Sequence, residues 1–335
     1  YSREILLPHK QSTNGPALAS ADVNGDGKDD FYVGGAAEQA GVLFLQQADG
    51  SFAAAPQQPW SSDRGNEDVG ALFFDADGDG DVDLYVASGG SEWVPGSERY
   101  ADRLYLNDGN GNFSKAPAGT LPRNYESGQA VAAGDFDNDG DLDLFVGGRI
   151  VPDKYPAPAN SYLLRNEGGQ FTDVTAEVAE GLNPLGLVTD ARFSDYDGDG
   201  DADLLVVGEW MPLTVLNNDN GTFRNHTEQA GMAQTGGWWW SIAEGDFDGD
   251  GDMDYMAGNL GKNAKFKASA EKPFLVYQSD FDKDGTNDVV LAGYYKGKQV
   301  PVRGRECSSQ QMPFIAEKYP TFEGFANASL EDIYS

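Results

Sequence analysis

The sequence predicts an all-β protein, a β-propeller of four-stranded blades followed by a short helical segment. Two observations predict this: a nine-residue acidic motif occurs six times, and each copy stands in the same pattern of β-prone runs. A unit of about four short strands recurring every ~40 to 60 residues is typical of propeller blades. The length alone would allow two domains. The repeat instead predicts one propeller over residues 1–305, with residues 306–335 as a partly helical extension packed on it.

The repeated motif reads acid-x-acid-x-acid-Gly-x-x-Asp. An apolar run leads into it, as at 70–74, and a β-prone run such as Leu84-Tyr85-Val86 follows. Further along, residues 103–113 form a predicted hairpin with glycines at its turn and Phe113 after it. Each repeat is therefore expected to form an antiparallel meander in which the acidic motif joins the first two strands.

The C-terminal end lacks this pattern. Apolar residues between Phe314 and Tyr334 favour helix, and Thr321 is a suitable N-cap. Gly324 weakens the helical prediction. Six repeats are visible and no seventh, so the sequence leaves open whether the ring has six or seven blades.

The composition excludes several classes of protein. Asp and Glu number 55 against 23 Lys and Arg, which gives a net charge of −32 and argues against nucleic-acid binding. The single cysteine, Cys307, excludes an internal disulfide framework, and its own role is left open. No apolar run reaches the ~18 residues of a membrane span.

The acidic motif predicts a calcium site in every repeat. Two carboxylates ~4 Å apart repel by roughly 4 kcal/mol at an effective dielectric constant of about 20, so the cluster requires a cation. Oxygen ligands in a flexible loop favour Ca²⁺, and the glycine at position 6 permits the sharp turn. We expect about six structural calcium ions. The predicted side-chain ligands, at positions 1, 3, 5 and 9, are Asp22, Asn24, Asp26 and Asp30; Asp75, Asp77, Asp79 and Asp83; Asp135, Asp137, Asp139 and Asp143; Asp195, Asp197, Asp199 and Asp203; Asp246, Asp248, Asp250 and Asp254; and Asp280, Asp282, Asp284 and Asp288. The predicted backbone carbonyl ligands, at position 7, are Lys28, Asp81, Asp141, Asp201, Asp252 and Thr286.

Two other interpretations of the motif are weaker. An EF-hand needs a bidentate Glu at position 12 and flanking helices, whereas position 12 is apolar in all six copies. Simple solvated turns would explain the Asp and Gly residues, but not six copies in one frame.

The loops resemble the FG-GAP/VCBS repeats of integrin-type propellers, and the strings 208–212, 237–239 and 258–261 are similar to bacterial relatives of cartilage acidic protein. The resemblance extends through about residue 305. It implies a secreted or surface-exposed protein, structural calcium between the first two strands of each blade, and a seven-bladed ring. Because six loops are present, further domains or chains could be missing from this sequence.

No catalytic constellation is evident, so we expect a binding or scaffold module rather than an enzyme. Protein partners are the first hypothesis. Polysaccharide binding through tryptophans is the second, although packing between blades would explain the same residues. A calcium-dependent polysaccharide lyase is the third. The candidate ligand-binding residues are Trp238, Trp240, Trp210 and Arg149. Weak calcium sites suit millimolar calcium, which favours an extracellular, periplasmic or outer-surface location.

Overall fold

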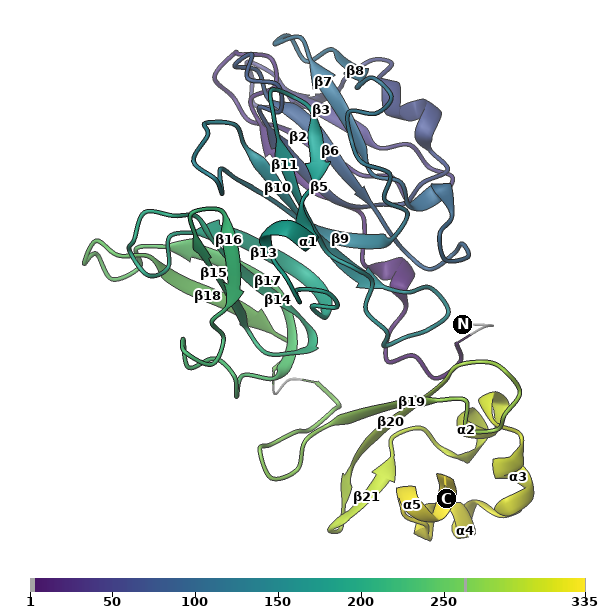
Figure 1. Cartoon of the computed structure of the whole chain (residues 1–335). Helices are drawn as coiled ribbons and strands as arrows, with labels where there is room; N and C mark the ends of the chain where they lie inside the picture. Colours follow the sequence, from purple (N-terminus) through teal and green to yellow (C-terminus); the bar gives the residue numbers. More distant parts are fainter. Residues whose placement is uncertain (1–3, 262–263, 335) are drawn as a thin grey trace. The chain divides into compact units, whose positions relative to one another are not determined.

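The computed structural model describes residues 4–261 and 264–334, and most of its regular elements are β-strands. The predicted all-β class is therefore confirmed. The chain divides into two compact units, which are described separately (Figure 1). The larger unit comprises Ser12–Pro152 and Pro158–Asn259, and the smaller unit comprises the described residues of Tyr1–Gln11, Asp153–Ala157 and Leu260–Ser335.

The larger unit contains four consecutive groups of four antiparallel strands, which we call blades 1 to 4; the first three are separate sheets, and the fourth belongs to a six-stranded sheet that also includes β17 and β18. In each blade the strands follow sequence order, because the acidic motif joins the first two strands and a short hairpin joins the last two. Blade 1 consists of β1 (Leu18–Ala21), β2 (Asp30–Val33), β3 (Val42–Gln46) and β4 (Phe52–Ala54), and blade 2 of β5 (Asp68–Phe74), β6 (Asp83–Ser88), β7 (Arg103–Asn107) and β8 (Phe113–Lys115). Blade 3 consists of β9 (Ser127–Gly134), β10 (Asp143–Ile150), β11 (Tyr162–Asn166) and β12 (Phe171–Asp173), and blade 4 of β13 (Leu187–Ser194), β14 (Asp203–Met211), β15 (Thr214–Asp219) and β16 (Thr222–Asn225).

The last two repeats depart from the expected four strands. The fifth has β17 (Gly237–Gly245) paired with β18 (Asp254–Asn259), and the start of β17 also pairs with the end of β14. The sixth, in the smaller unit, has three strands: β19 (Leu275–Ser279), β20 (Asp288–Tyr295) and β21 (Lys298–Pro301). In the described residues between β18 and β19, the stretch 264–272 is mostly exposed and contains Phe266 as its single large apolar residue. It therefore offers no apolar row that a third strand could bury.

The C-terminal segment is helical, as predicted. Its helices are α2 (Arg305–Gln311), α3 (Phe314–Lys318), α4 (Phe322–Asn327) and α5 (Leu330–Tyr334). Thr321 caps α4, because its Oγ1 accepts the N–H of Gly324 at 3.1 Å. The helices pack with β20 and Leu6 around Ile315 and Met312, both fully buried. The domain boundary at residue 305 stays a prediction.

The remaining helical elements are short. They are the 3-10 turns η1 (Gln11–Thr13), η2 (Pro59–Asp63) and η3 (Glu98–Tyr100) and the single-turn helix α1 (Thr175–Val178). Across the described parts of the chain, no helix has the length and apolar character needed to cross a membrane.

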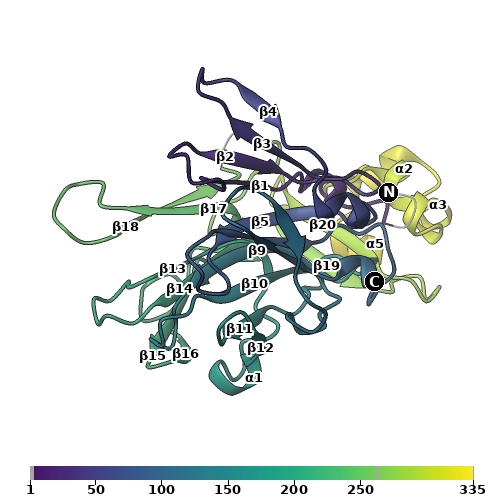
Figure 2. The same ribbon diagram turned by 90° about the horizontal axis from the view of Figure 1, so that it is seen from above.

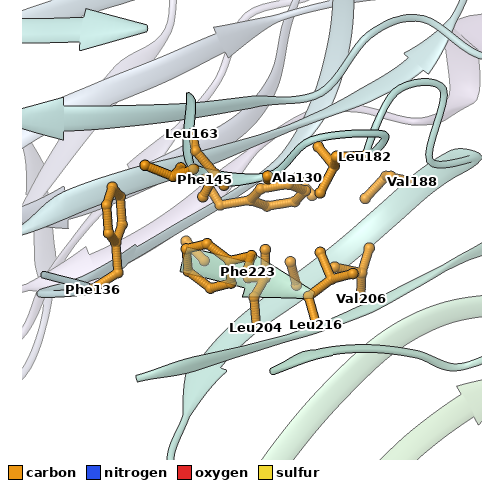
Figure 3. Close-up of a cluster of buried hydrophobic side chains, with 14 of the residues drawn as sticks. Ala130, Phe136, Phe145, Leu163, Leu182, Val188, Leu204, Val206, Leu216 and Phe223 are labelled. Carbon is orange, nitrogen blue, oxygen red and sulfur yellow. The ribbon is translucent and has the colours of Figure 1, made fainter. Parts of the chain in front are cut away.

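The blades of the larger unit pack face to face. Their first strands, β1, β5, β9 and β13, lie next to one another in this order (Figure 2). The strand β17 packs against β13. The core between blades 3 and 4 brings Phe145 and Leu163 of blade 3 against Leu204 and Phe223 of blade 4 (Figure 3). These side chains are at most 4% exposed. Since fully burying such a side chain contributes about 1.5–3 kcal/mol, packing between blades is a major source of stability.

Buried asparagines also connect successive blades. Each lies at or next to the end of a third strand and donates two hydrogen bonds from Nδ2. One reaches a carbonyl of its own blade's acidic loop, and the other a carbonyl in the loop of the preceding blade. Asn166, for example, donates to Leu142 O at 3.1 Å and to Ala76 O at 2.9 Å. The other two sets are Asn107 with Val82 and Val23, and Asn218 with Ala202 and Phe136.

We predict that Asn166→Ala lowers the free energy of unfolding by about 2–4 kcal/mol, because it leaves two buried carbonyls without donors. Urea denaturation followed by tryptophan fluorescence would measure the change. Asn110→Ala is the matched control: Asn110 is exposed in the hairpin of blade 2, and its loss should cost less than about 0.5 kcal/mol. Equal midpoints for the two variants would contradict the proposed role of Asn166.

Candidate metal-binding loops

The six acidic loops share one backbone geometry. In every copy the carboxylate at position 1 accepts the N–H of the glycine at position 6, at 2.7–3.2 Å. These glycines have φ between 79° and 100°, which confirms the sharp turn predicted at position 6. Position 4 also has positive φ in all six loops, although Asn138 and Lys283 occupy it in two of them. Position 4 is thus a second tight turn of the loop, and the motif alone did not predict it.

A second hydrogen bond tightens the turn. The Oδ1 atom of the residue at position 5 accepts the N–H of position 7 at 2.7–3.2 Å in all six copies. Backbone N–H groups thus hold the carboxylates inside the loop and partly offset their charge. In the first loop, the N–H of Gly27 holds the pKa of Asp22 below its ordinary value.

The aspartate at position 9 anchors the loop, and it is buried in every copy except the fifth, where Asp254 is half-buried. Its Oδ2 accepts the N–H of position 2 at 2.8–3.3 Å in all six loops. In blades 1 to 4 its Oδ1 accepts an N–H from the third strand at 2.7–2.8 Å. Burial nevertheless raises the pKa of Asp83 to about 6 and that of Asp143 to about 7.

Five of the six loops gather three carboxylates whose oxygens lie within 4.8 Å of one another, and these groups could hold a metal ion. The second, third and sixth loops combine positions 1, 3 and 9; the fourth and fifth combine positions 1, 3 and 5. The first loop, which the structure describes in full, forms no such group. Asn24 replaces one carboxylate there, and Lys28 Nζ donates to Asp26 Oδ2 at 2.8 Å.

The donor set of these groups fits a hard cation. The Oδ1 atoms of Asp77, Asp137 and Asp288 are buried and receive no hydrogen bond from the protein. A buried carboxylate oxygen without a donor is costly, and a bound cation would remove that cost. Only oxygen ligands are present, which suits Ca²⁺ or Mg²⁺ better than a soft metal.

The side chains at position 7 point elsewhere in two loops. Asp141 Oδ2 accepts the N–H of Gly168, and Asp201 Oδ2 that of Asn220, both at 2.7 Å. These carboxylates therefore hold the hairpin of their own blade. The predicted contribution of position 7 through its backbone carbonyl stays a prediction.

Third strands supply further contacts that the sequence analysis missed. Arg165 Nε forms an ion pair with Asp137 Oδ2 at 2.8 Å, and Asn217 Nδ2 donates to Asp197 Oδ2 at 2.8 Å. Each residue directly precedes the blade-connecting asparagine of its strand. A polar residue directly before the repeated asparagine was therefore the sequence feature that could have predicted these contacts to the acidic loops.

The four candidate ligand-binding residues come together away from the loops, where β10 and β14 end and β17 begins. Arg149 is 1% exposed, forms an ion pair with Glu209 at 3.0 Å, and lies over the Trp240 ring at 5.5 Å. The rings of Trp210 and Trp238 meet edge to face at 4.8 Å, and Trp238 is 8% exposed. The ion pair of Arg149 with Glu209 was not predicted from the sequence. The structure places these residues in a packed cluster, and their role in binding a ligand stays a prediction.

Fold and loops together define a repeat protein whose blades each carry an acidic loop between the first two strands. A model of the FG-GAP-like repeat matches residues 22–86, 89–146 and 195–257, so the chain belongs to the family of FG-GAP-like repeat proteins. The family expected from the motif is confirmed.

Individual similarities are more distant. Cartilage acidic protein 1 of Homo sapiens is 29% identical over 192 residues, which covers 55% of this chain and 27% of that protein. The Mus musculus protein is 29% identical over 191 residues, 55% of this chain and 28% of that protein. The chain thus spans about a quarter of the length of these relatives. Among solved structures, the V. cholerae biofilm matrix protein Bap1 has a TM-score of 0.38 at 16% identity, covering 83% of this chain and 37% of that chain. The Dos1 propeller has a TM-score of 0.36 at 10% identity, covering 68% and 60%.

We predict that Gly140→Ala destabilises the protein by about 1–3 kcal/mol, because φ is +100° at this position while nothing lies within 4 Å of an added Cβ. The cost would therefore come from the backbone alone. Thermal denaturation would measure it against Gly236→Ala, whose added Cβ is equally free and whose φ is not in the left-handed region. A Gly140→Ala melt equal to that of the control would show that the loop adopts another conformation.

Proposed function

We propose that the chain is an extracellular, calcium-stabilised β-propeller module that binds or scaffolds protein partners without catalysing a reaction. The observation that carries the proposal is the convergence of carboxylates in five loops, each held by the same backbone hydrogen bonds. The all-oxygen ligands and the flexible loop favour Ca²⁺ over Mg²⁺, which demands near-ideal octahedral geometry. In the first loop, Asp22, Asn24, Asp26 and Asp30 would give a weaker sixth site because Lys28 supplies a competing charge.

The position of the loops supports a structural role for calcium. Each loop joins the first two strands of a blade, and its position 9 aspartate also contacts the third strand in blades 1 to 4. A cation bound there would hold three strands at one end. Within each loop, the side chains at positions 1, 3, 5 and 9 would bind the ion, and the glycine at position 6 would maintain the turn.

We predict that chelation lowers the thermal stability of the protein. A site saturated a hundredfold above its Kd contributes about 2.7 kcal/mol, so EGTA should lower the melting temperature by many degrees. Asp77→Asn is the most informative variant, since Asp77 Oδ1 receives no hydrogen bond that the substitution could remove. Its melting temperature in EGTA should equal or exceed that of the wild type, because the substitution removes a carboxylate that Asp75 and Asp79 repel. In millimolar calcium its melting temperature should fall below that of the wild type.

Glu38→Gln is the control for charge, because Glu38 is exposed and lies outside the acidic loops. It should behave as the wild type with and without calcium. Calorimetric melts that do not change on adding EGTA, for the wild type and both variants, would disprove structural calcium.

An extracellular location follows from the proposed calcium sites. Flexible loop sites with Kd values of about 10⁻⁴–10⁻³ M are typical of extracellular modules, and such sites fill only where calcium is millimolar. The similarity to cartilage acidic protein 1 is consistent with this location.

Protein partners are favoured over polysaccharides by the exposed surface. On one face of blade 1, Leu18, Val42 and Phe52 are 69%, 37% and 45% exposed, and Phe31 stacks with Phe44 beside them. Flat apolar surface of this kind suits a protein contact. Trp60, by contrast, is 3% exposed beneath Tyr32 and Tyr105, and Trp238 is nearly buried. These two rings have little surface left for stacking on sugars.

We predict that the protein migrates freely in native gels that contain neutral or anionic polysaccharides, with calcium present. Retardation by one polymer that is lost in Trp240→Ala would make carbohydrate binding the first hypothesis, ahead of protein binding. Appearance of shorter products in the same gels would show a lyase or hydrolase. Phe113→Leu, a substitution within the core between blades 1 and 2, serves as the control for changes in packing.

A further inference from the structure

Two glutamates come together at the end of blade 2 that is remote from its acidic loop. Glu67 immediately precedes β5, and Glu92 follows the end of β6 by four residues. The acidic loop of this blade connects the opposite ends of the same two strands. The glutamate pair is therefore separate from all six loops.

Both carboxylates point to the space above Gly90. Glu67 is 4% exposed, whereas Glu92 is exposed. Gly90 has φ +86°, and a Cβ at this residue would collide with the Oε2 atoms of both glutamates. The glycine thus leaves the space over its Cα to the two carboxylates.

Local hydrogen bonds fix this arrangement. The N–H of Gly89 donates to the carbonyl of Glu67 at 3.1 Å, and the N–H of Ser91 donates to Glu92 Oε2 at 2.9 Å. From blade 3, Ser127 Oγ donates to the carbonyl of Gly90 at 2.7 Å. The backbone around the pair is thereby held from two blades.

No positively charged side chain pairs with either glutamate in the described residues. Glu67 Oε2 is buried and receives no hydrogen bond from a protein donor. Arg103, which lies on the adjacent β7, is paired with Asp68 at 2.7 Å. Burial, followed by the hydrogen bond to Glu92 and the charge of Glu92, raises the pKa of Glu67 to about 8. Without a bound cation the pair therefore holds one shared proton at neutral pH, and a cation would take the place of that proton.

We propose that Glu67 and Glu92 bind a hard divalent cation between them, at a site distinct from the acidic loops. Two carboxylates of which one is buried without a donor offer the ligands that Ca²⁺ and Mg²⁺ prefer. The ion would connect the start of β5 to the segment between β6 and η3, and the exposed side of Glu92 leaves a path for it to enter. The site does not depend on the proposed calcium sites in the loops.

Isothermal titration calorimetry on the full chain, first stripped with EGTA and then dialysed, would test this. CaCl₂ is the probe, with MgCl₂ in a second series. Glu92→Gln and Glu67→Gln should each bind one ion fewer than the wild type and keep the remaining ions. Glu98→Gln, an exposed residue of the same connection, should bind as many as the wild type. Unchanged ion numbers in both series for Glu92→Gln and Glu67→Gln would overturn the proposal.

Three other variants keep the result interpretable. If Glu67→Gln fails to fold, the number of ions bound by Glu92→Ala tests the proposal, because Glu92 is exposed and its truncation leaves the core intact. Asp77→Asn should remove a different ion, so the double variant Asp77→Asn with Glu92→Gln should lose two. Loss of an ion in Glu92→Gln but not in Asp77→Asn would support the glutamate site while contradicting the second-loop site. The opposite result would overturn the glutamate site alone.

Discussion

Each blade depends on one buried carboxylate, the aspartate at position 9 of the acidic loop. In blades 1 to 4 its two oxygens accept one N–H from the loop and one from the third strand, so a single side chain holds three strands at one end. Hydrogen bonds to a charged group contribute about 1.5–3 kcal/mol each, but the charge is held where water is largely excluded. The raised pKa values of Asp83 and Asp143 show that cost. A nearby cation would lower it, which is why anchoring and metal binding belong together in this fold.

Much of the fold could be predicted because its determinants are local. The spacing of acids in the motif sets which backbone N–H groups they accept, and Gly140 and its equivalents allow the turn between them. These relations lie within nine residues and repeat six times, so the sequence was sufficient for the loops, for the four-stranded meander of blades 1 to 4, and for the family. The helical C-terminal segment was also predictable, since Thr321 caps it through a contact three residues away.

Features that depend on distant residues could not be predicted. The position of Asn166 before a hairpin turn can be read from the sequence, but its hydrogen bond to the carbonyl of Ala76 cannot, because Ala76 lies in another blade. Arg149 was predicted as a candidate ligand-binding residue, but its burial could not be predicted, because it depends on an ion pair with Glu209, sixty residues later in the chain. The missing strands of the fifth repeat have a similar cause. A strand forms only where neighbours can bury it, and the stretch 264–272 has too little apolar surface for that.

The blade-connecting asparagines all link a blade to the one that precedes it in the sequence. Each belongs to one blade and reaches back to the loop of the blade before it, so neighbours are coupled in pairs as in a one-dimensional lattice. The fourth loop lies at the end of this series, because the described part of the fifth repeat has no third strand to supply an asparagine. Under tension, or at the onset of heating, we expect the two ends of the series to open before its middle blades, because each end blade has an asparagine contact to one neighbour only. The remaining blades would then unfold stepwise, because each blade that opens leaves its neighbour with one contact fewer.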